Sequence, residues 1–321
     1  MQLTIILSIL ALVVGLFLIE RSAESFTGAV GATARRFHAS ESVVGLLTAG
    51  GEWEELVVVV IALASGHASL AVGNVVGSCL ANLLGSMPLG FLGPHPLAPD
   101  RSARIYAGVM LVVTALATVF FFGGRVTRAE GGILVGVFLV YVTSVLIVIR
   151  KGLLAPPASD DATDDEPHQQ SLVRTVGVLV FSLLVISLGA ELVVEGATRI
   201  ARVAGLSEYA IGATVVALGT TLPDKAISLI GGLRGQGGVV TANATGSNIF
   251  LLTLVLGISA LASHAGLAIS SSVSHVDGPL LLAVSVLVTV LFQRRSLHRA
   301  IGLSLLTLYL GYLAYALLRG A

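Results

Sequence analysis

Charged residues and cysteines are scarce in this sequence. Only 11% of its 321 residues are charged, whereas a soluble domain carries about 25%, so the chain has too little polar surface for a water-soluble protein of this size. The formal net charge is zero, which leaves a nucleic-acid partner without an electrostatic basis. The single cysteine, Cys79, excludes an internal disulfide and a site built from several thiolates.

Motifs of the common enzyme classes are missing as well. The sequence contains no HExxH, P-loop or GxSxG pattern, and no apolar run carries a nucleophile with a base or a metal-ligand spacing. We therefore do not expect an enzyme. The first residues, MQLTIILSILALVVGLFLIE, have no basic segment before the apolar run, so we interpret them as a membrane helix rather than a signal peptide.

Long apolar runs dominate what remains, because 55% of the residues are hydrophobic. One crossing of a bilayer takes about 20 apolar residues. This criterion predicts ten transmembrane helices, at residues 2–36, 41–65, 69–91, 102–122, 131–149, 172–203, 208–233, 239–262, 277–293 and 298–318. The first and sixth are longer than one crossing and are expected to be tilted. The predicted fold class is an all-α polytopic membrane protein.

One polar segment, GLLAPPASDDATDDEPHQQS (152–171), interrupts these runs. Its paired prolines and five acidic residues predict a solvated linker, and weak regulatory Ca²⁺ binding is the alternative. It divides the chain into an N-terminal unit, 1–151, and a C-terminal unit, 172–321. The connections on the linker's side of the membrane carry 11 basic residues against 5 on the other side, which predicts a cytoplasmic linker and external termini, in a prokaryotic cell membrane.

The two units are related by an internal repeat. GNVVGSCLANLLGSMPLG (73–90) is similar to ANATGSNIFLLTLVLG (242–257) at an offset of 169 residues, and residues 23–45 match 190–212 at an offset of 167. Each unit holds five predicted spans, an odd number, so the second unit enters the membrane from the opposite face. Inverted repeats of this kind bind their substrates near the bilayer midplane, at broken helices.

The second repeat offers oxygen ligands at such a break. In ALGTTLPDKA (217–226), Pro223 interrupts the helix and frees backbone carbonyls. The hydroxyls of Thr220 and Thr221 and the carboxylate of Asp224 complete a set of oxygens that suits a hard cation. An acid inside a span is costly and usually functional. An ion pair between Asp224 and its neighbour Lys225 is the structural alternative.

The first repeat places an acid at the matching position. Glu55 precedes Ser78 by 23 residues, as Asp224 precedes Ser247, so Glu55 and Asp224 are symmetry mates. Since like charges in an apolar segment repel, the two further acids Glu52 and Glu54 are expected to be protonated, paired or cation-bound in part. A segment at the membrane interface, with Trp53 in the aromatic belt and the acids in water, is the alternative.

Asn82 and Ser78 share one helix face, four residues apart, and are expected to present an amide and a hydroxyl to the same cavity. The mate of Asn82 is Leu251, which predicts an asymmetric site. Asn74 and Asn243 either line this cavity or join helices by hydrogen bonds, and the sequence leaves both possibilities open.

These segments resemble a known family. ALGTTLPDKA followed by NATGSNIF, with a divergent copy in the first unit, is similar to the α-repeats of the cation/Ca²⁺ exchanger superfamily, which includes the sodium/calcium exchangers. The resemblance implies alternating access at one central site without a cofactor. It also implies the ligands: Glu55 and Asp224 as the acidic metal-binding positions, Ser78, Asn82 and Ser247 on the facing helices, and Thr220, Thr221 and the carbonyl of Ala217 in the second repeat.

Several positions depart from the family pattern. The family's Thr-Ser-x-Pro-Glu reads Gly-Glu-Trp-Glu-Glu at residues 51–55, Asp224 stands for the usual Glu, and Lys225 adds a positive charge beside the site. Because several Na⁺ ligands are lost, exchange of three Na⁺ ions is not expected. We predict a secondary antiporter for inorganic cations that exchanges Ca²⁺ for H⁺ or Na⁺. A membrane sensor or partner protein that keeps the exchanger fold without transport is the alternative.

Overall fold

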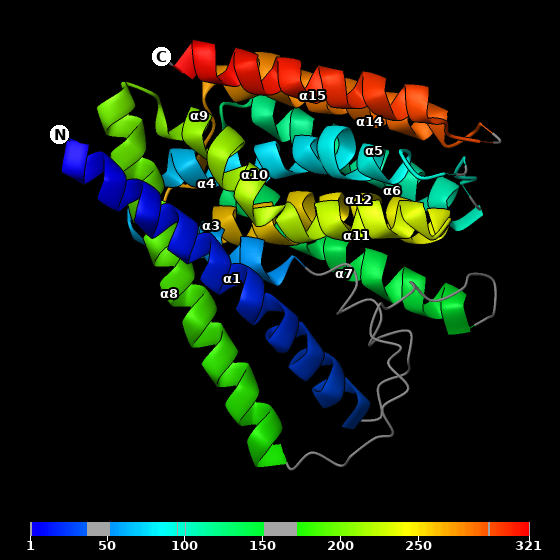
Figure 1. Cartoon of the computed structure of the whole chain (residues 1–321), viewed down its shortest axis with the longest axis horizontal. Coiled ribbons are helices and arrows are strands. Elements are labelled where there is room, and N and C mark those ends of the chain that lie inside the picture. Colours follow the sequence, from blue (N-terminus) through cyan, green and yellow to red (C-terminus); the bar gives the residue numbers. More distant parts are fainter. Residues whose placement is uncertain are drawn as a thin grey trace.

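The computed structural model describes residues 2–36, 52–94, 96–99, 101–150, 172–294 and 296–320. In the N-terminal unit the elements are α1 (Gln2–Arg36), α3 (Trp53–Ala64), α4 (Ala68–Leu80), the π-helical segment η1 (Ala81–Ser86), α5 (Met87–Gly90), α6 (Arg101–Phe122), β1 (Arg125–Val126) and α7 (Arg128–Arg150). Figure 1 shows a bundle of helices lying close to parallel or antiparallel, crossed on one side by two long helices.

The C-terminal unit repeats this order. Its elements are α8 (Leu172–Ala204), α9 (Glu208–Ile211), η2 (Gly212–Val216), α10 (Ala217–Thr220), α11 (Leu222–Leu233), α12 (Gly237–Phe250), η3 (Leu251–Val255), α13 (Leu256–Ala262), β2 (Leu267–Ala268), η4 (Val273–Asp277), α14 (Gly278–Leu291) and α15 (Arg299–Gly320). The linker predicted at 152–171 lies outside the described residues.

The described helices confirm a polytopic membrane protein. Eight of them are long and apolar enough to cross a bilayer, and a ninth span results if the pair 208–220 and 222–233, bent by 48°, is counted as one. The second of the ten predicted spans, 41–65, falls partly outside the described residues, and its described part is the 12-residue α3. Within the parts of the chain that the structure describes, the other nine predictions each correspond to a helix or a broken helix.

Two backbone pairings between loops display the inverted symmetry of the units. β1 pairs with β2 in antiparallel fashion, Val126 opposite Leu267, and an isolated bridge joins Leu97 to Leu297. Leu97 and Leu267 are 170 residues apart in the chain, and Val126 and Leu297 are 171 apart, so one pairing is the symmetry image of the other. The loop after α6 therefore meets the loop after α13, not its own mate after α14, as two units of opposite orientation require.

The symmetry axis passes close to Cys79 and Asn248. The Asn248 side-chain amide donates a hydrogen bond of 3.1 Å to the backbone carbonyl of Cys79. Their separation in the chain, 169 residues, is the offset of the repeat itself, so these mates contact each other across the axis. Cys79 is fully buried, which agrees with its role as a small packing residue there.

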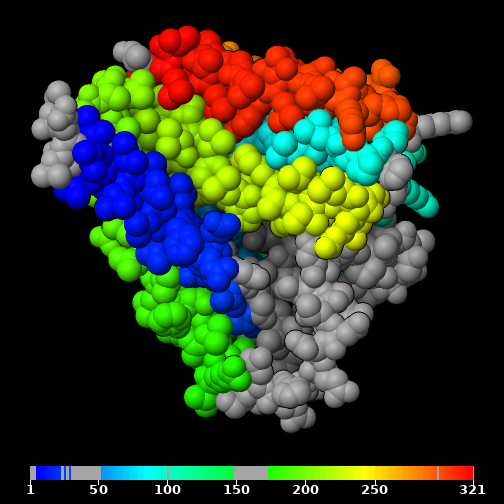
Figure 2. All heavy atoms as spheres, in the orientation of Figure 1, coloured from blue at the N-terminus to red at the C-terminus, as the bar shows by residue number. Residues whose placement is uncertain are grey.

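Helices α1 and α8 lie side by side and cross the remaining helices diagonally, as Figure 1 shows. Gly15 and Gly189 allow this packing, because a Cβ on either one would lie within 3 Å of the other's carbonyl oxygen. Large apolar side chains of α1, among them Phe17 at 58% exposure, point outward. Figure 2 shows α1 on the outer face of the molecule, where such side chains suit contact with lipid.

Breaks in the innermost helices determine where polar groups gather. The segments η1, η2 and η3 interrupt the third, seventh and eighth predicted spans, which are three of the four spans for which Gly or Pro predicts an interruption. A further break lies at Thr221, where Pro223 starts the first turn of α11. π-helical segments and helix ends leave backbone groups outside the regular pattern, so these places suit a polar site.

Candidate functional site

Glu55 lies at the centre of the predicted site. It is in the first turn of α3 and fully buried. Its Oε1 accepts hydrogen bonds from the Ser78 hydroxyl at 2.7 Å and from the Thr220 hydroxyl at 2.6 Å, and its Oε2 accepts one from the Asn74 amide. Because Thr220 belongs to the other unit, this carboxyl group binds both broken segments together.

Asp224 occupies the matching place in the second unit. It lies in the first turn of α11 with 6% of its surface exposed, and its Oδ1 accepts a hydrogen bond of 2.8 Å from the Asn243 amide. Each asparagine follows its acid by 19 residues. Asn74 and Asn243 thus hold the two carboxyl groups in place, which decides a question that the sequence leaves open.

Two further acids lie beside this pair. Glu52, at the N-terminus of α3, is 5% exposed and lies near the carboxyl group of Asp224 and the hydroxyl of Ser247. Glu54 is half-buried. Trp53, between them, packs edge-on against Phe250 with 5.4 Å between ring centroids. These acids lie inside the bundle, so the alternative that places them in water at the interface is wrong.

Lys225 turns back toward the helix break. Its Nζ donates hydrogen bonds to the Leu218 carbonyl at 3.3 Å, to the Thr221 carbonyl at 3.2 Å and to the Thr221 hydroxyl. The carbonyl of Ala217, a predicted ligand, accepts from the Thr221 hydroxyl at 2.6 Å. The ammonium group therefore occupies oxygens that a bound cation would otherwise take, and it offsets part of the negative charge of the acids.

Several buried oxygens near the acids have no hydrogen-bond partner among the described residues. They include Oδ2 of Asp224, Oγ of Ser247, Oδ1 of Asn248 and both amide atoms of Asn82. An unpaired buried polar group costs about 1–3 kcal/mol, so this grouping favours a cation or water that satisfies it. No three His, Cys, Asp or Glu side chains in the described ranges are arranged around one metal position, so hydroxyl, amide and carbonyl oxygens must supply most ligands.

The predicted site residues thus come from both units into one interior region, whereas two other residues were missed. Ser86 and Ser228 are fully buried with unpartnered hydroxyls, and the sequence analysis does not select them. Each follows a predicted site residue, Asn82 or Asp224, by four positions on the same helix face. This spacing was the available signal.

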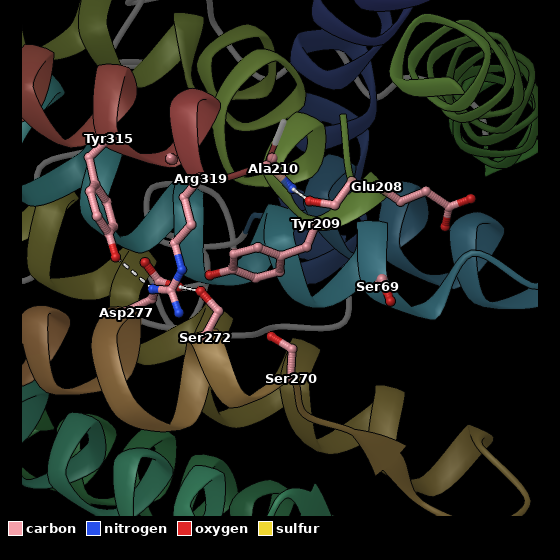
Figure 3. A pocket seen from close by; sticks show the side chains of 12 residues that line it. Ser69, Glu208, Tyr209, Ala210, Ser270, Ser272, Asp277, Tyr315 and Arg319 are labelled. Carbon is pink, nitrogen blue, oxygen red and sulfur yellow. Dashed lines mark hydrogen bonds between the residues drawn. The ribbon is translucent and has the colours of Figure 1, made fainter. Parts of the chain in front are cut away.

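A separate cavity of about 320 Å³ lies at the end of the bundle where α9 begins and α15 ends. Figure 3 shows the side chains of Arg319 and Tyr209 extending toward Asp277. Asp277 accepts a hydrogen bond of 2.9 Å from Ser272, and Arg319 donates one of 2.6 Å to the hydroxyl of Tyr315. None of the predicted site residues lines this cavity.

Comparison with known proteins decides the family. The chain matches the family described as "Sodium/calcium exchanger protein" over residues 7–147 and 174–318. The chain belongs to this family. The coarse assignment follows: it is an integral membrane cation antiporter of the sodium/calcium exchanger family, and the relatives described below are transport proteins rather than enzymes.

Individual relatives of the exchanger family cover nearly the whole chain. A protein named "Putative antiporter CaxA" from Alkalimonas amylolytica is 31% identical over 93% of this chain and 95% of its own. "Sodium/calcium exchanger MaX1" from Methanosarcina acetivorans is 25% identical over 96% and 98%. The solved structure of the sodium-calcium exchanger NCX_Mj, soaked with Na⁺ and Sr²⁺, is 26% identical, with a TM-score of 0.64 over 97% of this chain and 98% of that one.

Proposed function

We propose that this exchanger transports Ca²⁺ against Na⁺ or H⁺ by alternating access at the site between Glu55 and Asp224. The observation that carries the proposal is the hydrogen bond of 2.6 Å from Thr220 to Glu55. It joins the broken helix of one unit to the acid of the other, in the interior of the bundle. A site shared in this way is rebuilt whenever the two units move relative to each other, which is what alternating access requires.

The charge of the site supports a divalent substrate. Two buried carboxyl groups, with hydroxyl and amide oxygens around them, provide the hard ligands that Ca²⁺ takes in proteins. The ligands proposed for it are Glu55, Asp224, Ser78, Asn82, Ser247 and Thr220, with Glu52 and Glu54 as neighbouring charges. Thr221 and the Ala217 carbonyl are held by each other and by Lys225, so we propose that they bind a cation only after the lysine has moved.

The arrangement of the chain in the membrane is part of the proposal. We propose that 1–151 and 172–321 are the two moving units, with 152–171 as a cytoplasmic linker and both termini outside. The match to the exchanger family in two segments, 7–147 and 174–318, leaves the linker unmatched and so supports this division. The excess of basic residues in the connections on the linker's side supports the orientation.

Reconstituted vesicles test this function. We expect uptake of radioactive Ca²⁺ driven by a Na⁺ or pH gradient, and loss of that uptake in Glu55→Gln and in Asp224→Asn. The matched control is Glu195→Gln, because Glu195 is 52% exposed and paired only with Arg199 on the outside of α8. An unaltered chain without Ca²⁺ flux under either gradient would support the non-transporting sensor instead.

A further inference from the structure

The helix that carries Asp224 runs parallel to the helix that carries Asn82, and the two touch along their length. A Cβ on Gly77 would lie 2.4 Å from the Ala213 carbonyl oxygen, and one on Gly232 would lie 2.1 Å from the Gly90 carbonyl oxygen. Because the residue numbers rise together in these contacts, α9–α11 and α4–α5 point the same way, as Figure 1 also shows. The backbones thus meet on both sides of the acid cluster.

Polar side chains line this contact beyond the acids. Along α11, Asp224 and Ser228 lead at four-residue steps to the contact at Gly232, and along η1 and α5, Asn82 and Ser86 lead to Gly90. A Cβ on Gly90 would lie 3.0 Å from the Ser228 carbonyl oxygen. Ser86 and Ser228 therefore lie between the acids and the close backbone contact, and we call them with Asn82 the polar row.

The polar row has no partners of its own among the residues described. Asn82, Ser86 and Ser228 are fully buried, and neither the amide atoms nor the two hydroxyls form a hydrogen bond. Leaving each buried group unpaired costs about 1–3 kcal/mol. Groups of this kind inside a membrane protein mark the route or the site of a polar substrate.

The symmetry-related positions provide an internal comparison. The mates of Asn82, Ser86 and Ser228 at the 169-residue offset are Leu251, Val255 and Val59, and all three are fully buried and apolar. The polar row thus extends from the acids toward one membrane face only, the face at the end of α11, which we expect to be cytoplasmic. Packing of two repeats does not require this asymmetry.

We propose that the polar row is a second cation site that holds the monovalent counter-ion Na⁺ on the cytoplasmic side of the acids. Its ligands are uncharged hydroxyl and amide oxygens with the single carboxyl group of Asp224 at one end. That charge balances one monovalent ion, whereas a divalent ion gains from additional carboxylates. The inference rests on the proposed antiport and deepens it, because it selects Na⁺ over H⁺ as the exchanged ion.

Binding of radioactive Na⁺ to the purified full-length protein, at constant ionic strength, tests the site without requiring transport. We expect Ser86→Ala/Ser228→Ala to bind Na⁺ about tenfold more weakly, as the loss of two ligands implies, with Ca²⁺ affinity changed less than about twofold. The matched control is Val59→Ala/Val255→Ala, which alters the symmetry-related positions and should keep the parental Na⁺ affinity.

Parental Na⁺ affinity in the serine double variant overturns the inference, and so does a parallel loss of Na⁺ and Ca²⁺ binding, which indicates one common site. If the double variant does not fold, the two single variants are measured against the same criteria, with a roughly threefold loss expected for each. Failure of the antiport proposal is seen separately, as absent Ca²⁺ flux in vesicles of the unaltered chain, because Na⁺ binding is measured on protein in solution.

Discussion

The hydroxyl of Thr220 donates a hydrogen bond of 2.6 Å to Glu55, which precedes it in the chain by 165 residues. The donor ends the last turn before a helix break, and the acceptor lies in the first turn of α3. Two units of opposite orientation thus share one buried carboxyl group, and this shared contact is the basis of the proposed mechanism.

Removal of the Thr220 hydroxyl should weaken both the fold and the site. We expect Thr220→Val to lower the free energy of unfolding by about 1–3 kcal/mol, because Glu55 keeps its burial but loses a donor. The measurement is thermal unfolding with and without Ca²⁺. The control is Thr245→Val, since the buried hydroxyl of Thr245 bonds only to carbonyl oxygens of its own helix. Equal stability in the two variants would contradict the bridging role.

Asn243 should be needed to orient Asp224. It gives Asp224 its printed hydrogen bond at 2.8 Å, whereas Glu55 has three donors. We therefore expect Asn243→Ala to weaken Ca²⁺ binding by roughly 10–100-fold, the usual effect of losing a group that orients a ligand. Asn74→Ala is the paired variant and should have the smaller effect, because two donors to Glu55 remain. Calorimetric titration of both with Ca²⁺ checks the order, and a reversed order would refute it.

Lys225 should lower the affinity of the site for cations. Its ammonium group binds the carbonyl oxygens freed at the helix break, and a fixed positive charge repels an incoming ion. Lys225→Gln is expected to bind Ca²⁺ several-fold more tightly, by about 1 kcal/mol at a distance of a few ångström in a polar surrounding. Lys225→Arg keeps the charge and should not. Tighter binding in both variants would show that the charge is not the cause.

The close contact between Gly90 and Gly232 should not tolerate a side chain. A Cβ on Gly232 would lie 2.1 Å from a backbone oxygen of Gly90, so Gly232→Ala forces the helices apart. We expect a loss of about 1–3 kcal/mol in the free energy of unfolding. Gly136→Ala is the control, because nothing lies within 4 Å of its Cβ position. A thermal unfolding series with both variants measures the difference, and equal stabilities would argue against close packing.

Sequence patterns sufficed for the spans and the repeat because both depend on local order. Apolar runs of bilayer length predict helices, and the 169-residue offset identifies Glu55 as the mate of Asp224 before any contact is known. The contact between Cys79 and Asn248 confirms that offset. The direction in which side chains turn is not local, however. That Lys225 binds the carbonyls behind it rather than pairing with Asp224 depends on the geometry of the break.

The polar row shows a second limit of prediction from one sequence. Ser86 and Ser228 are ordinary residues in apolar spans, and serine is common where membrane helices pack closely. Their interest arises only when two parallel helices bring both hydroxyls to one contact without other partners. His67 is a similar case: it was expected in a solvent-exposed loop, yet it forms a 2.9 Å contact with Glu208 across the units and is only 22% exposed.

The most direct measurement is a crystal structure of the protein soaked with Sr²⁺ as a heavy substitute for Ca²⁺, with anomalous difference maps to locate the ion. The account predicts a peak between the side chains of Glu55, Ser78, Asp224 and Ser247, and its disappearance in Glu55→Gln. A map with Sr²⁺ elsewhere, for example only at the acidic segment 160–166, and none between these four residues would contradict it.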